Sequence, residues 1–381
     1  MNFELTEEHK LVRKTVRDFA EREIKPIAKD LDEKGEFSID LTKKMGEMGL
    51  FGMYLPEEYG GQHTDTLSYI IAVEELARVD SSQAATLAAH NSLGIGPLYY
   101  YGTKEQKEKY LPKLCTGEHL WAFGLTEPEA GSDSRGTKTT AIVENDQWVI
   151  NGSKIFITNG ASSLSLGATV QTYTNTPKGG HQFTTIIVEK GTPGYTSRAM
   201  HGKMMWRASD TAELYFDDCR VPEDNQLGRK GQGSKIMLST LDNGRLSIGA
   251  MGLGLAQGAF EMALKYSKER HQFGKPISTF QAISFRLADM AMKIELARNL
   301  LYKACRMKDS GKPFGKEAAM SKLYCSEIAK EIADDAVQIF GGYGLMKDYP
   351  VERFYRDQRL LQIGEGTSEI QRLVIARHIL E

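Results

Sequence analysis

The sequence predicts an α+β protein of several domains: an N-terminal α-helical domain, a middle antiparallel β-domain and a C-terminal α-helical domain resembling a four-helix bundle. Three observations predict this architecture. Helical spacing of apolar residues prevails in the first third, short strand-like runs fill the middle, and long helical patterns fill the remainder. We place the domains at residues 1–119, 120–229 and 230–381.

In the N-terminal domain, Val12, Val16 and Phe19 fall on one face of a helix. Further helical patterns run from about Leu67 to Arg78 and from Lys104 to Leu114. The first domain is therefore expected to be entirely helical.

The middle domain has the features of a sheet of short strands. Residues 141–150 are typical of a hairpin that turns at Asn145 and Asp146. Residues 182–188 and 211–216 are rich in β-branched and aromatic residues, which favour strands.

Long helical patterns return in the C-terminal domain, at residues 245–270, 280–307 and 316–340. Their length is typical of a helical bundle. The first pattern contains four glycines, which would permit close helix approach although each disfavours the helix by about 1 kcal/mol relative to alanine. They are Gly249, Gly252, Gly254 and Gly258.

Composition excludes several classes of protein. The chain has 381 residues and a net charge of −2, so binding to nucleic acid is not expected. No apolar run is long enough for an integral membrane segment, and the acidic N-terminus does not resemble a signal peptide. The four cysteines and eight histidines show no metal-ligand spacing, so no metal is expected. We expect a cytoplasmic protein with reduced thiols, or a mitochondrial matrix protein if this is a processed form.

Motifs for nicotinamide folds and phosphate loops are absent, and the strongest chemical signal is Glu365. This carboxylate stands between Gly364 and Gly366, just before a helix that is expected to begin at Thr367. Burial among apolar groups would raise its pKa toward neutrality, as a general base requires. Taken alone, the motif favours a solvated glutamate in a surface turn, because short motifs have many false positives, so other segments must decide.

Five segments together resemble the acyl-CoA dehydrogenase family, in the same order and over essentially the whole chain. They are Phe123 to Asp133, Lys154 to Gly160, Asp242 to Arg245, Glu269 to Ile277 with Phe280 and Gln281, and Gln338 to the Glu365 loop. The resemblance implies the acyl-CoA dehydrogenase fold, an FAD cofactor and α,β-dehydrogenation of an acyl-CoA to the 2-enoyl-CoA. It implies that Glu365 abstracts the α-proton and that flavin N5 takes the β-hydride.

The resemblance also implies three sets of binding residues. Flavin contacts fall on Phe123, Leu125, Thr126, Gly131, Ser132, Phe156, Ile157 and Thr158. Contacts with the rest of FAD, partly across a subunit boundary, fall on Arg270, Gln272, Phe273, Phe280, Gln281, Gln338, Gly341, Gly342, Thr367, Ser368 and Glu369. Acyl-CoA contacts fall on Ser132, Asp242, Asn243, Arg245 and Gly366.

Each of these assignments has a structural alternative. Phe156 to Thr158 could be plain strand, Gly131 and Ser132 a plain loop, and Arg245 and Arg270 solvated side chains. Thr367 could serve only in a helix-capping box, which is compatible with a binding role.

Departures from the family pattern narrow the prediction. Some relatives carry the base on the long helix, where this chain has Gly244, so Glu365 is expected to be the sole base in a short- or medium-chain, butyryl-CoA dehydrogenase-like enzyme. Gly364 replaces a tyrosine of many relatives and could admit branched or alicyclic acyl groups. Ala84 and Asn91 replace charged residues of the glutaryl and some alicyclic types, which argues against those substrates.

The resemblance implies electron-transferring flavoprotein as the electron acceptor and a homotetramer arranged as a dimer of dimers. Two alternatives stay open. The enzyme could run in reverse as an enoyl-CoA reductase, or the chain could be a non-catalytic scaffold that binds CoA or FAD.

Overall fold

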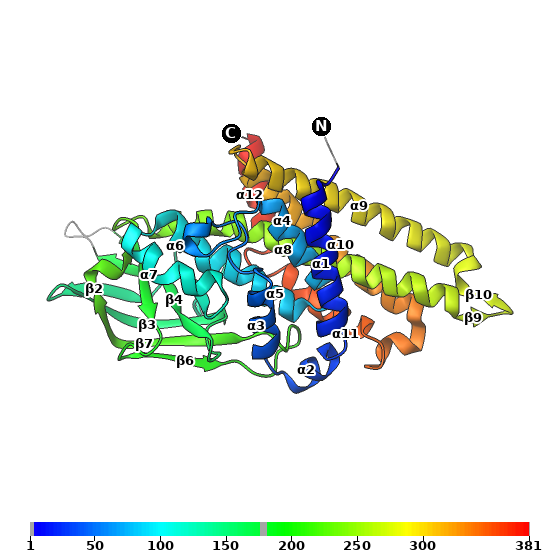
Figure 1. Cartoon of the computed structure of the whole chain (residues 1–381), viewed down its shortest axis with the longest axis horizontal. Coiled ribbons are helices and arrows are strands. Elements are labelled where there is room, and N and C mark those ends of the chain that lie inside the picture. The colour runs from blue at the N-terminus through cyan, green and yellow to red at the C-terminus, as the bar shows by residue number, and fades with distance from the viewer. Residues whose placement is uncertain (1–3, 176–180, 381) are drawn as a thin grey trace.

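The computed structural model describes residues 4–175 and 181–380. A twisted sheet forms one end of the molecule, and long helices extend from it to a small hairpin at the opposite end (Figure 1). Within the described ranges, no helix combines the length and apolarity needed to cross a membrane.

Short, capped helices make up the N-terminal part. Thr6, Asp65 and Thr103 accept backbone N–H bonds at the starts of α1, α4 and α7, as expected for N-cap residues. The helices are α1 (Glu7–Phe19), α2 (Ala28–Lys34), α3 (Ile39–Glu47), α4 (Thr66–Ala77), α5 (Ser81–Ala89), α6 (Gly96–Tyr101) and α7 (Lys104–Cys115), with π-helical turns at Ala20–Ile24 and His90–Ile95.

The middle of the chain folds into one mixed sheet. Among the described residues it has eight strands in the order β6-β7-β3-β2-β4-β5-β8, with β1 beside β4. Most pairs are antiparallel as predicted, but β1 and β2 each pair with β4 in parallel. The strands are β1 (Leu120–Gly124), β2 (Thr140–Glu144), β3 (Gln147–Thr158), β4 (Ser165–Asn175), β5 (His181–Glu189), β6 (Tyr195–Ala199), β7 (Thr211–Pro222) and β8 (Gln226–Leu227).

The predicted hairpin turn is confirmed. Glu144 pairs with Gln147, and Asn145 and Asp146 both have positive φ, of 49° and 59°. Two left-handed residues are the requirement of a type I′ turn, which asparagine and aspartate tolerate.

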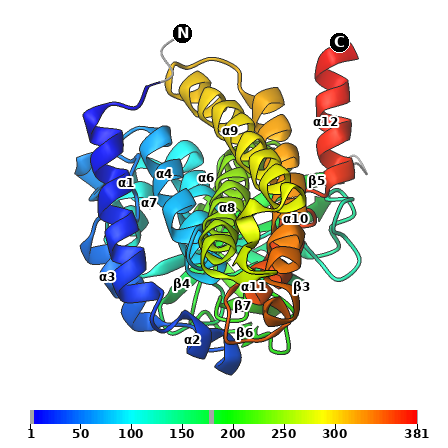
Figure 2. The same ribbon diagram turned by 90° about the vertical axis from the view of Figure 1, so that its right-hand side faces the viewer.

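Among the described residues, five α-helices follow the sheet, and the first is longer than predicted. They are α8 (Gly233–Glu269), α9 (Gln281–Asp309), α10 (Gly315–Phe340), α11 (Val351–Leu361) and α12 (Ser368–Leu380). The predicted start of the first long helix near Arg245 is wrong, because α8 begins at Gly233. A two-stranded hairpin of β9 (His271–Gln272) and β10 (Lys275–Pro276) separates α8 from α9. Viewed along its length, α8 lies among α4, α9 and α10 (Figure 2).

The glycines of α8 lie where neighbouring helices come closest, as predicted. An added Cβ at Gly252 would lie 2.8 Å from the carbonyl oxygen of Cys325 on α10. At Gly254 and Gly258 it would overlap the carbonyl oxygens of Glu74 and Arg78 at the end of α4. Small residues thus let α8 pack against two helices at once.

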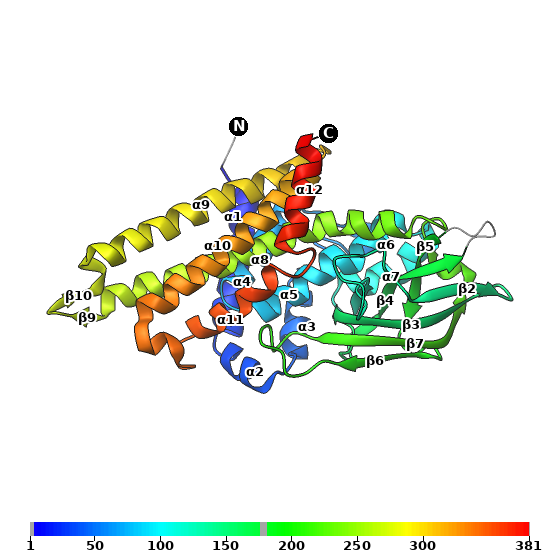
Figure 3. The same cartoon turned by 180° about the vertical axis from the view of Figure 1, so that it is seen from behind.

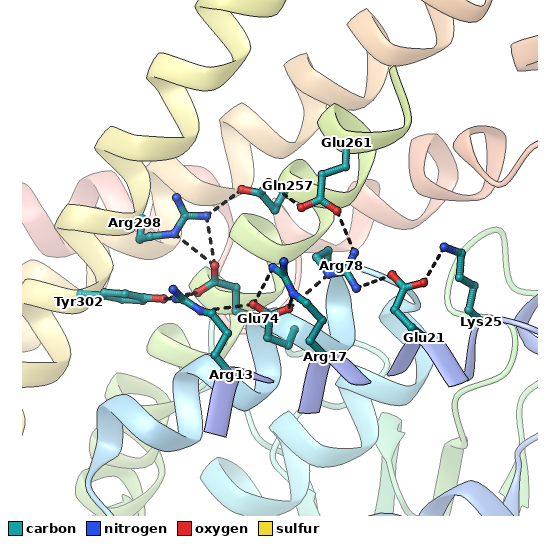
Figure 4. Close-up of polar contacts among 11 residues, drawn as sticks. Arg13, Arg17, Glu21, Lys25, Glu74, Arg78, Gln257, Glu261, Arg298 and Tyr302 are labelled. Atoms are coloured by element: carbon teal, nitrogen blue, oxygen red, sulfur yellow. Dashed lines mark hydrogen bonds and ion pairs between the residues drawn. The ribbon is translucent and has the colours of Figure 1, made fainter. Parts of the chain in front are cut away.

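A buried ion network ties the N-terminal helices to the bundle (Figure 4). Glu74 and Glu75 of α4 are 2% and 1% exposed. Arg17 of α1 forms a bidentate pair with Glu75, with N–O distances of 2.8 and 3.0 Å. Arg298 of α9 binds Glu74 at 3.2 Å, so one pair of carboxylates joins three helices. Each carboxylate has more than one cationic partner, because Arg13 approaches both and Arg78 also pairs with Glu75, so the buried charges are compensated by a network rather than by single pairs.

Replacing Gly254 by alanine should destabilise the protein. The new Cβ would overlap a backbone oxygen that cannot move without shifting α4. We expect a loss of about 1–3 kcal/mol, as for overpacked cores, measured as a lower midpoint of urea unfolding.

Gly249→Ala on the same helix is the control. There the added Cβ would lie 3.2 Å from a terminal methyl group of Leu301, which can shift more easily than backbone, so little stability should be lost. Equal unfolding midpoints for the two variants would contradict the close-packing explanation.

Candidate active site

Glu365 lies in the loop between α11 and α12, in a backbone conformation that non-glycine residues rarely adopt. Its φ is +53°, and that of Gly366 is +95°. The residue is half-buried, yet its Oε2 atom is inaccessible to solvent and has no hydrogen-bond partner. A buried polar atom without a partner is unfavourable and marks a candidate functional group.

The Glu365 carboxylate occupies space that Gly244 of α8 leaves open. A Cβ at position 244 would overlap Oε2 and lie 2.9 Å from the carboxyl carbon. The same Cβ would be 3.0 Å from Leu93, in the π-helical turn after α5. The C-terminal loop, α8 and the π-helical turn after α5 therefore meet around this carboxylate. Figure 3 shows the ribbon of the loop before α12 passing α8.

The environment of Glu365 suits a base near neutral pH. Burial raises its pKa to about 7, although the positive charges of Lys322 and Arg245 oppose the rise. A pKa near the working pH is what general-base catalysis favours.

The segment from Phe123, in β1, to Thr126, here called the flavin strip, adjoins this carboxylate. Phe123 and Leu125 are largely buried and pack with Met237 of α8 and with Leu93. Since Leu93 also reaches the position of Gly244, the strip and Glu365 border one region. Thr126 follows Leu125, and Gly131 and Ser132 lie farther on in an exposed loop.

An irregularity in β3 turns an aromatic ring outward beside this strip. The register with β7 shifts between Lys154 and Ile157, and Phe156 has a φ of +60°. Its side chain is 63% exposed. The Ile155 N–H donates to the carbonyl of Thr126, at 3.0 Å, so the ring is held next to the strip.

These residues fit a flavin, which needs a flat face and polar groups at its edge. Phe156 offers the face, while Thr126 and the half-buried Thr158 offer hydroxyls. Ile157, also predicted to contact FAD, is 3% exposed and packs in the sheet core, whereas Phe156 faces outward, because successive side chains of a strand point to opposite faces. Its backbone, not its side chain, is therefore the part that could contact the flavin.

Two polar side-chain atoms on α8 lack hydrogen-bond partners near Glu365. Asn243 Oδ1 and Arg245 Nε are buried without a hydrogen bond. Arg245 is 5% exposed and also pairs with Asp242. An anchor for a polar substrate would satisfy both atoms, whereas the alternative of a solvated arginine is excluded by burial.

The start of α12 follows Glu365 directly. Thr367 Oγ1 accepts the N–H of Ile370 at 3.2 Å, which is an N-cap. It is not a capping box, because Ile370 stands where a glutamate or glutamine would be needed. The Ser368 hydroxyl donates to Glu327 at 2.6 Å and is buried, so it is already engaged within the chain, while Glu369 is exposed.

The other predicted FAD residues form a second group at the far end of α8. Arg270 is the C-cap of α8, and its guanidinium lies 5.6 Å from the ring centre of Tyr343. Phe273 is 93% exposed, and its ring centre is 5.9 Å from that of Phe280. Exposed in the same region are Gln272, Gln281, Gln338, Gly341 and Gly342.

The two groups lie far apart within a single chain. Gly244 and Arg270 lie 26 positions apart along one helix, which is about 39 Å at 1.5 Å per residue. An added Cβ at Gly341 or Gly342 meets no atom of the described residues within 4 Å, so both glycines leave backbone open to a ligand. The separation fits the expectation that FAD is bound across a subunit boundary.

Sequence reasoning missed the side chains that hold the flavin strip in place. Lys154 is 1% exposed, and its Nζ donates to the Leu125 carbonyl at 3.2 Å and to Glu127 at 2.7 Å. Burial lowers the pKa of Lys154 to about 8. Lys154 and Glu127 both belong to segments that resemble the family. The sequence alone does not show whether a charged residue in a strand is exposed or buried, so their pairing was not predicted.

The sequence also missed Lys322 and Gln371, which hold the Glu365 loop. Lys322 Nζ donates to the Gly366 carbonyl at 2.7 Å, and Gln371 Nε2 to the same oxygen at 2.9 Å. In the helical pattern each resembles an ordinary surface residue. In the part of the chain that the structure describes, no group of three or more His, Cys, Asp or Glu could hold a metal ion.

Comparison with known proteins agrees with this geometry. Residues 6–118, 122–219 and 231–380 match the N-terminal, middle and C-terminal domains of acyl-CoA dehydrogenase. The probable acyl-CoA dehydrogenase YngJ of Bacillus subtilis (strain 168) is 52% identical over 381 residues, covering 100% of both chains.

Solved structures match equally well. Butyryl-CoA dehydrogenase from Megasphaera elsdenii is 46% identical, with a TM-score of 0.97 and 100% coverage of both chains. A chain from work on the electron transferring flavoprotein of Acidaminococcus fermentans and flavin-based electron bifurcation is 47% identical, with the same TM-score and coverage.

The fold and these similarities define a flavin-dependent oxidoreductase. The chain belongs to the acyl-CoA dehydrogenase family, and it dehydrogenates acyl-CoA thioesters with FAD.

Replacing Gly244 by alanine should reduce turnover strongly while leaving the fold intact. The added Cβ would push the Glu365 carboxylate out of its place. Misplacing a reacting group by about 1 Å can cost about a hundredfold in rate. Steady-state kcat with butyryl-CoA measures the loss.

The unfolding midpoint of this variant should not fall, because alanine favours a helix over glycine. Gly249→Ala, five positions along the same helix, should keep normal kcat. Normal kcat in Gly244→Ala would contradict the observed placement of the carboxylate.

Proposed function

We propose that Glu365 is the base that removes the α-proton of a short- or medium-chain acyl-CoA. One observation carries the proposal: its Oε2 is buried, unpaired and packed against the space of Gly244, beside the strip of Phe123 and Leu125. A non-catalytic scaffold would have no use for such an atom, since an unpaired buried polar group reduces stability.

In the proposed mechanism, Glu365 must be ionised when the substrate arrives. Burial keeps its pKa near 7, so the carboxylate can accept a proton in neutral solution. The backbone N–H of Glu365 is our candidate donor to the thioester carbonyl, where it would stabilise the enolate-like transition state. Bound FAD supplies the acceptor of the β-hydride. Gly366, next in the chain, is placed to let the backbone approach the substrate.

The polar end of CoA would lie along α8 and the exposed loop after β1. Arg245 and Asn243 have buried atoms that lack partners, and Asp242 orients Arg245. Ser132, on the exposed loop, is our candidate for a contact with both the flavin and CoA.

We infer that the FAD of one subunit is completed by the hairpin region of another. Arg270, Gln272, Phe273, Phe280, Gln281, Gln338, Gly341 and Gly342 would bind the diphosphate and adenosine, and Thr367 to Glu369 would contact FAD from the start of α12. The exposed side chains of Phe285, Met292 and Leu296 on α9 support burial between subunits, since apolar residues in a row favour an interface. A homotetramer, as a dimer of dimers, is the proposed assembly.

The acyl group is proposed to be short or medium, straight, branched or alicyclic. Gly364 supports the wider range, because an added Cβ would only reach ordinary contact with Leu360, at 3.5 Å, so the glycine leaves room for a larger group. Asn91 stands where some alicyclic relatives carry an aspartate. Its amide binds the backbone of Leu50 and Gly52 and is fully buried, so it holds the fold together and does not supply a second acidic group, which supports an ordinary α,β-dehydrogenation. Ala84 is buried in the helical core and cannot meet a distal carboxylate.

The proposed electron acceptor is electron-transferring flavoprotein, which the Acidaminococcus comparison supports. The four cysteines are unpaired and buried, which agrees with a reducing compartment such as the cytoplasm. No residue of the site favours the reverse direction, enoyl-CoA reduction, over dehydrogenation.

Glu365→Gln should keep FAD bound and lose at least about a hundredfold in kcat, the usual contribution of a general base.

In the wild type, kcat/KM should rise with pH through about 7, because Glu365 is protonated and inactive below its pKa. Turnover of butyryl-CoA with an artificial electron acceptor, measured from pH 5.5 to 9, checks both.

The control is Glu331→Gln, on an exposed part of α10. It should behave like the wild type. A Glu365→Gln enzyme with wild-type rates would refute the assignment of the base.

A hybrid experiment tests the shared cofactor site. Arg270→Ala should lose FAD affinity, and Glu365→Gln should lose the base. If each site combines Glu365 of one subunit with Arg270 of another, co-expression of the two variants rebuilds one intact site per hybrid dimer. Purified hybrids should therefore exceed both parents in activity.

The control is a chain that carries both Arg270→Ala and Glu365→Gln. Its homo-oligomers contain no intact site and should remain inactive. Hybrids no more active than their parents would show that the two groups of residues do not combine across a boundary.

A further inference from the structure

We propose that Lys322 of α10 is a positioning residue for the base: its buried ammonium group holds the Gly366 carbonyl and keeps a positive charge beside the Glu365 carboxylate. The inference rests on the proposed role of Glu365. It assigns to one lysine both the backbone geometry and the ionisation of the loop.

The geometry of the contact supports a clamp. The Gly366 carbonyl receives two donors, Lys322 Nζ at 2.7 Å from α10 and Gln371 Nε2 at 2.9 Å from α12. Gln371 Nε2 also approaches the Glu365 carbonyl, at 3.2 Å. Two lone pairs of one carbonyl oxygen are thus occupied from two different helices.

The loop needs such a clamp because its backbone is strained. Glu365 is not glycine, yet its φ is +53°. Residues in this region relax unless their surroundings hold them there. Relaxation would turn the carboxylate away from the space above Gly244.

A purely structural role explains Lys322 poorly. The residue is 0% exposed, and among the described residues Nζ finds a single hydrogen-bond acceptor, although an ammonium carries three donors. Burying a charge without a carboxylate partner is costly, and an apolar side chain would fill the same volume more favourably. The ammonium is therefore retained for its charge and its donor.

That charge acts mainly on Glu365. The ionisable groups around Lys322 are Glu365, Arg245, Glu327 and Glu369. Those acting on Glu365 are Lys322 from α10 and Arg245 from α8, and the phenol of Tyr69 on α4 is neutral, its pKa raised by burial.

The second cation near Glu365 is already neutralised in part, since Arg245 is paired with Asp242. Lys322 has no such ion pair among the described residues, and burial lowers its pKa only to about 8, so it is largely protonated at pH 7. Its field therefore stabilises the carboxylate form of Glu365 more directly than that of Arg245.

The test compares Lys322→Met with Gln371→Leu in the FAD-loaded enzyme. Lys322→Met removes the charge and one donor. The rise of kcat/KM with pH, here called the acid limb, should move up by about one pH unit, because losing a nearby positive charge raises the pKa of a carboxyl group. The value of kcat/KM at high pH, here called the plateau, should fall. Gln371→Leu removes donors but no charge, so the plateau should fall without a shift of the limb.

A second readout does not depend on turnover. Infrared difference titration of the Glu365 carboxyl, with Glu365→Gln as the reference, should show the same upward shift in Lys322→Met. If that variant does not fold, Lys322→Gln, which also lacks the charge, takes its place with the same expected shift.

Lys308→Met is the matched control. Lys308 is half-buried, its pKa is also lowered by burial to about 8, and its Nζ lies 4.9 Å from the centre of the Tyr54 ring. The charges that act on Glu365 are those of Lys322 and Arg245, not that of Lys308. Lys308→Met should leave the limb and the carboxyl titration unchanged.

The outcomes separate two failures. If the wild type shows an acid limb that Glu365→Gln abolishes, but folded Lys322→Met leaves the limb and the infrared titration unshifted, only the role of Lys322 is overturned. If Glu365→Gln is fully active, the proposed base itself is wrong.

Discussion

The structure depends on one constraint: a carboxylate must sit unpaired in an apolar space and still ionise near pH 7. Three features allow this. Gly244 leaves room for Oε2, a left-handed backbone directs the side chain of Glu365 into it, and the charges of Lys322 and Arg245 offset part of the desolvation. Each feature belongs to a different segment, so the base exists only when α8, α10 and the C-terminal loop are assembled.

Helix α8 is the element that makes this assembly possible. Its glycines allow carbonyl groups of α4 and α10 to approach closely, which fixes the helix between the N-terminal part and the bundle. Glu74 and Glu75 reinforce the same contact through arginines from α1 and α9. The helix is long enough to carry the region of Glu365 near one part and the β9–β10 hairpin at its far end, and this length is the physical reason why we propose a site shared between subunits.

The sheet contributes to the candidate flavin site through an irregularity in β3. At the bulge in β3, Phe156 turns outward while Ile157 stays in the core. The buried pair of Lys154 and Glu127 then binds the strip after β1 from behind. A flat aromatic face and a polar edge result, each held by groups that are themselves fixed in the core.

Resemblance of five segments to the acyl-CoA dehydrogenase family indicated Glu365 as the candidate base. The sequence by itself determined the order of helical and strand regions, the hairpin turn at Asn145 and Asp146, and the helix-packing glycines. These follow from local periodicity and from residue types whose conformational preferences are strong. Tertiary structure alone decided the start of α8 well before Asp242, the parallel pairs of β1 and β2 with β4, the inward turn of Ile157 and the buried lysines. The physical reason is that burial, charge pairing and strand register depend on residues far apart in the chain, and no local pattern records which of them will meet.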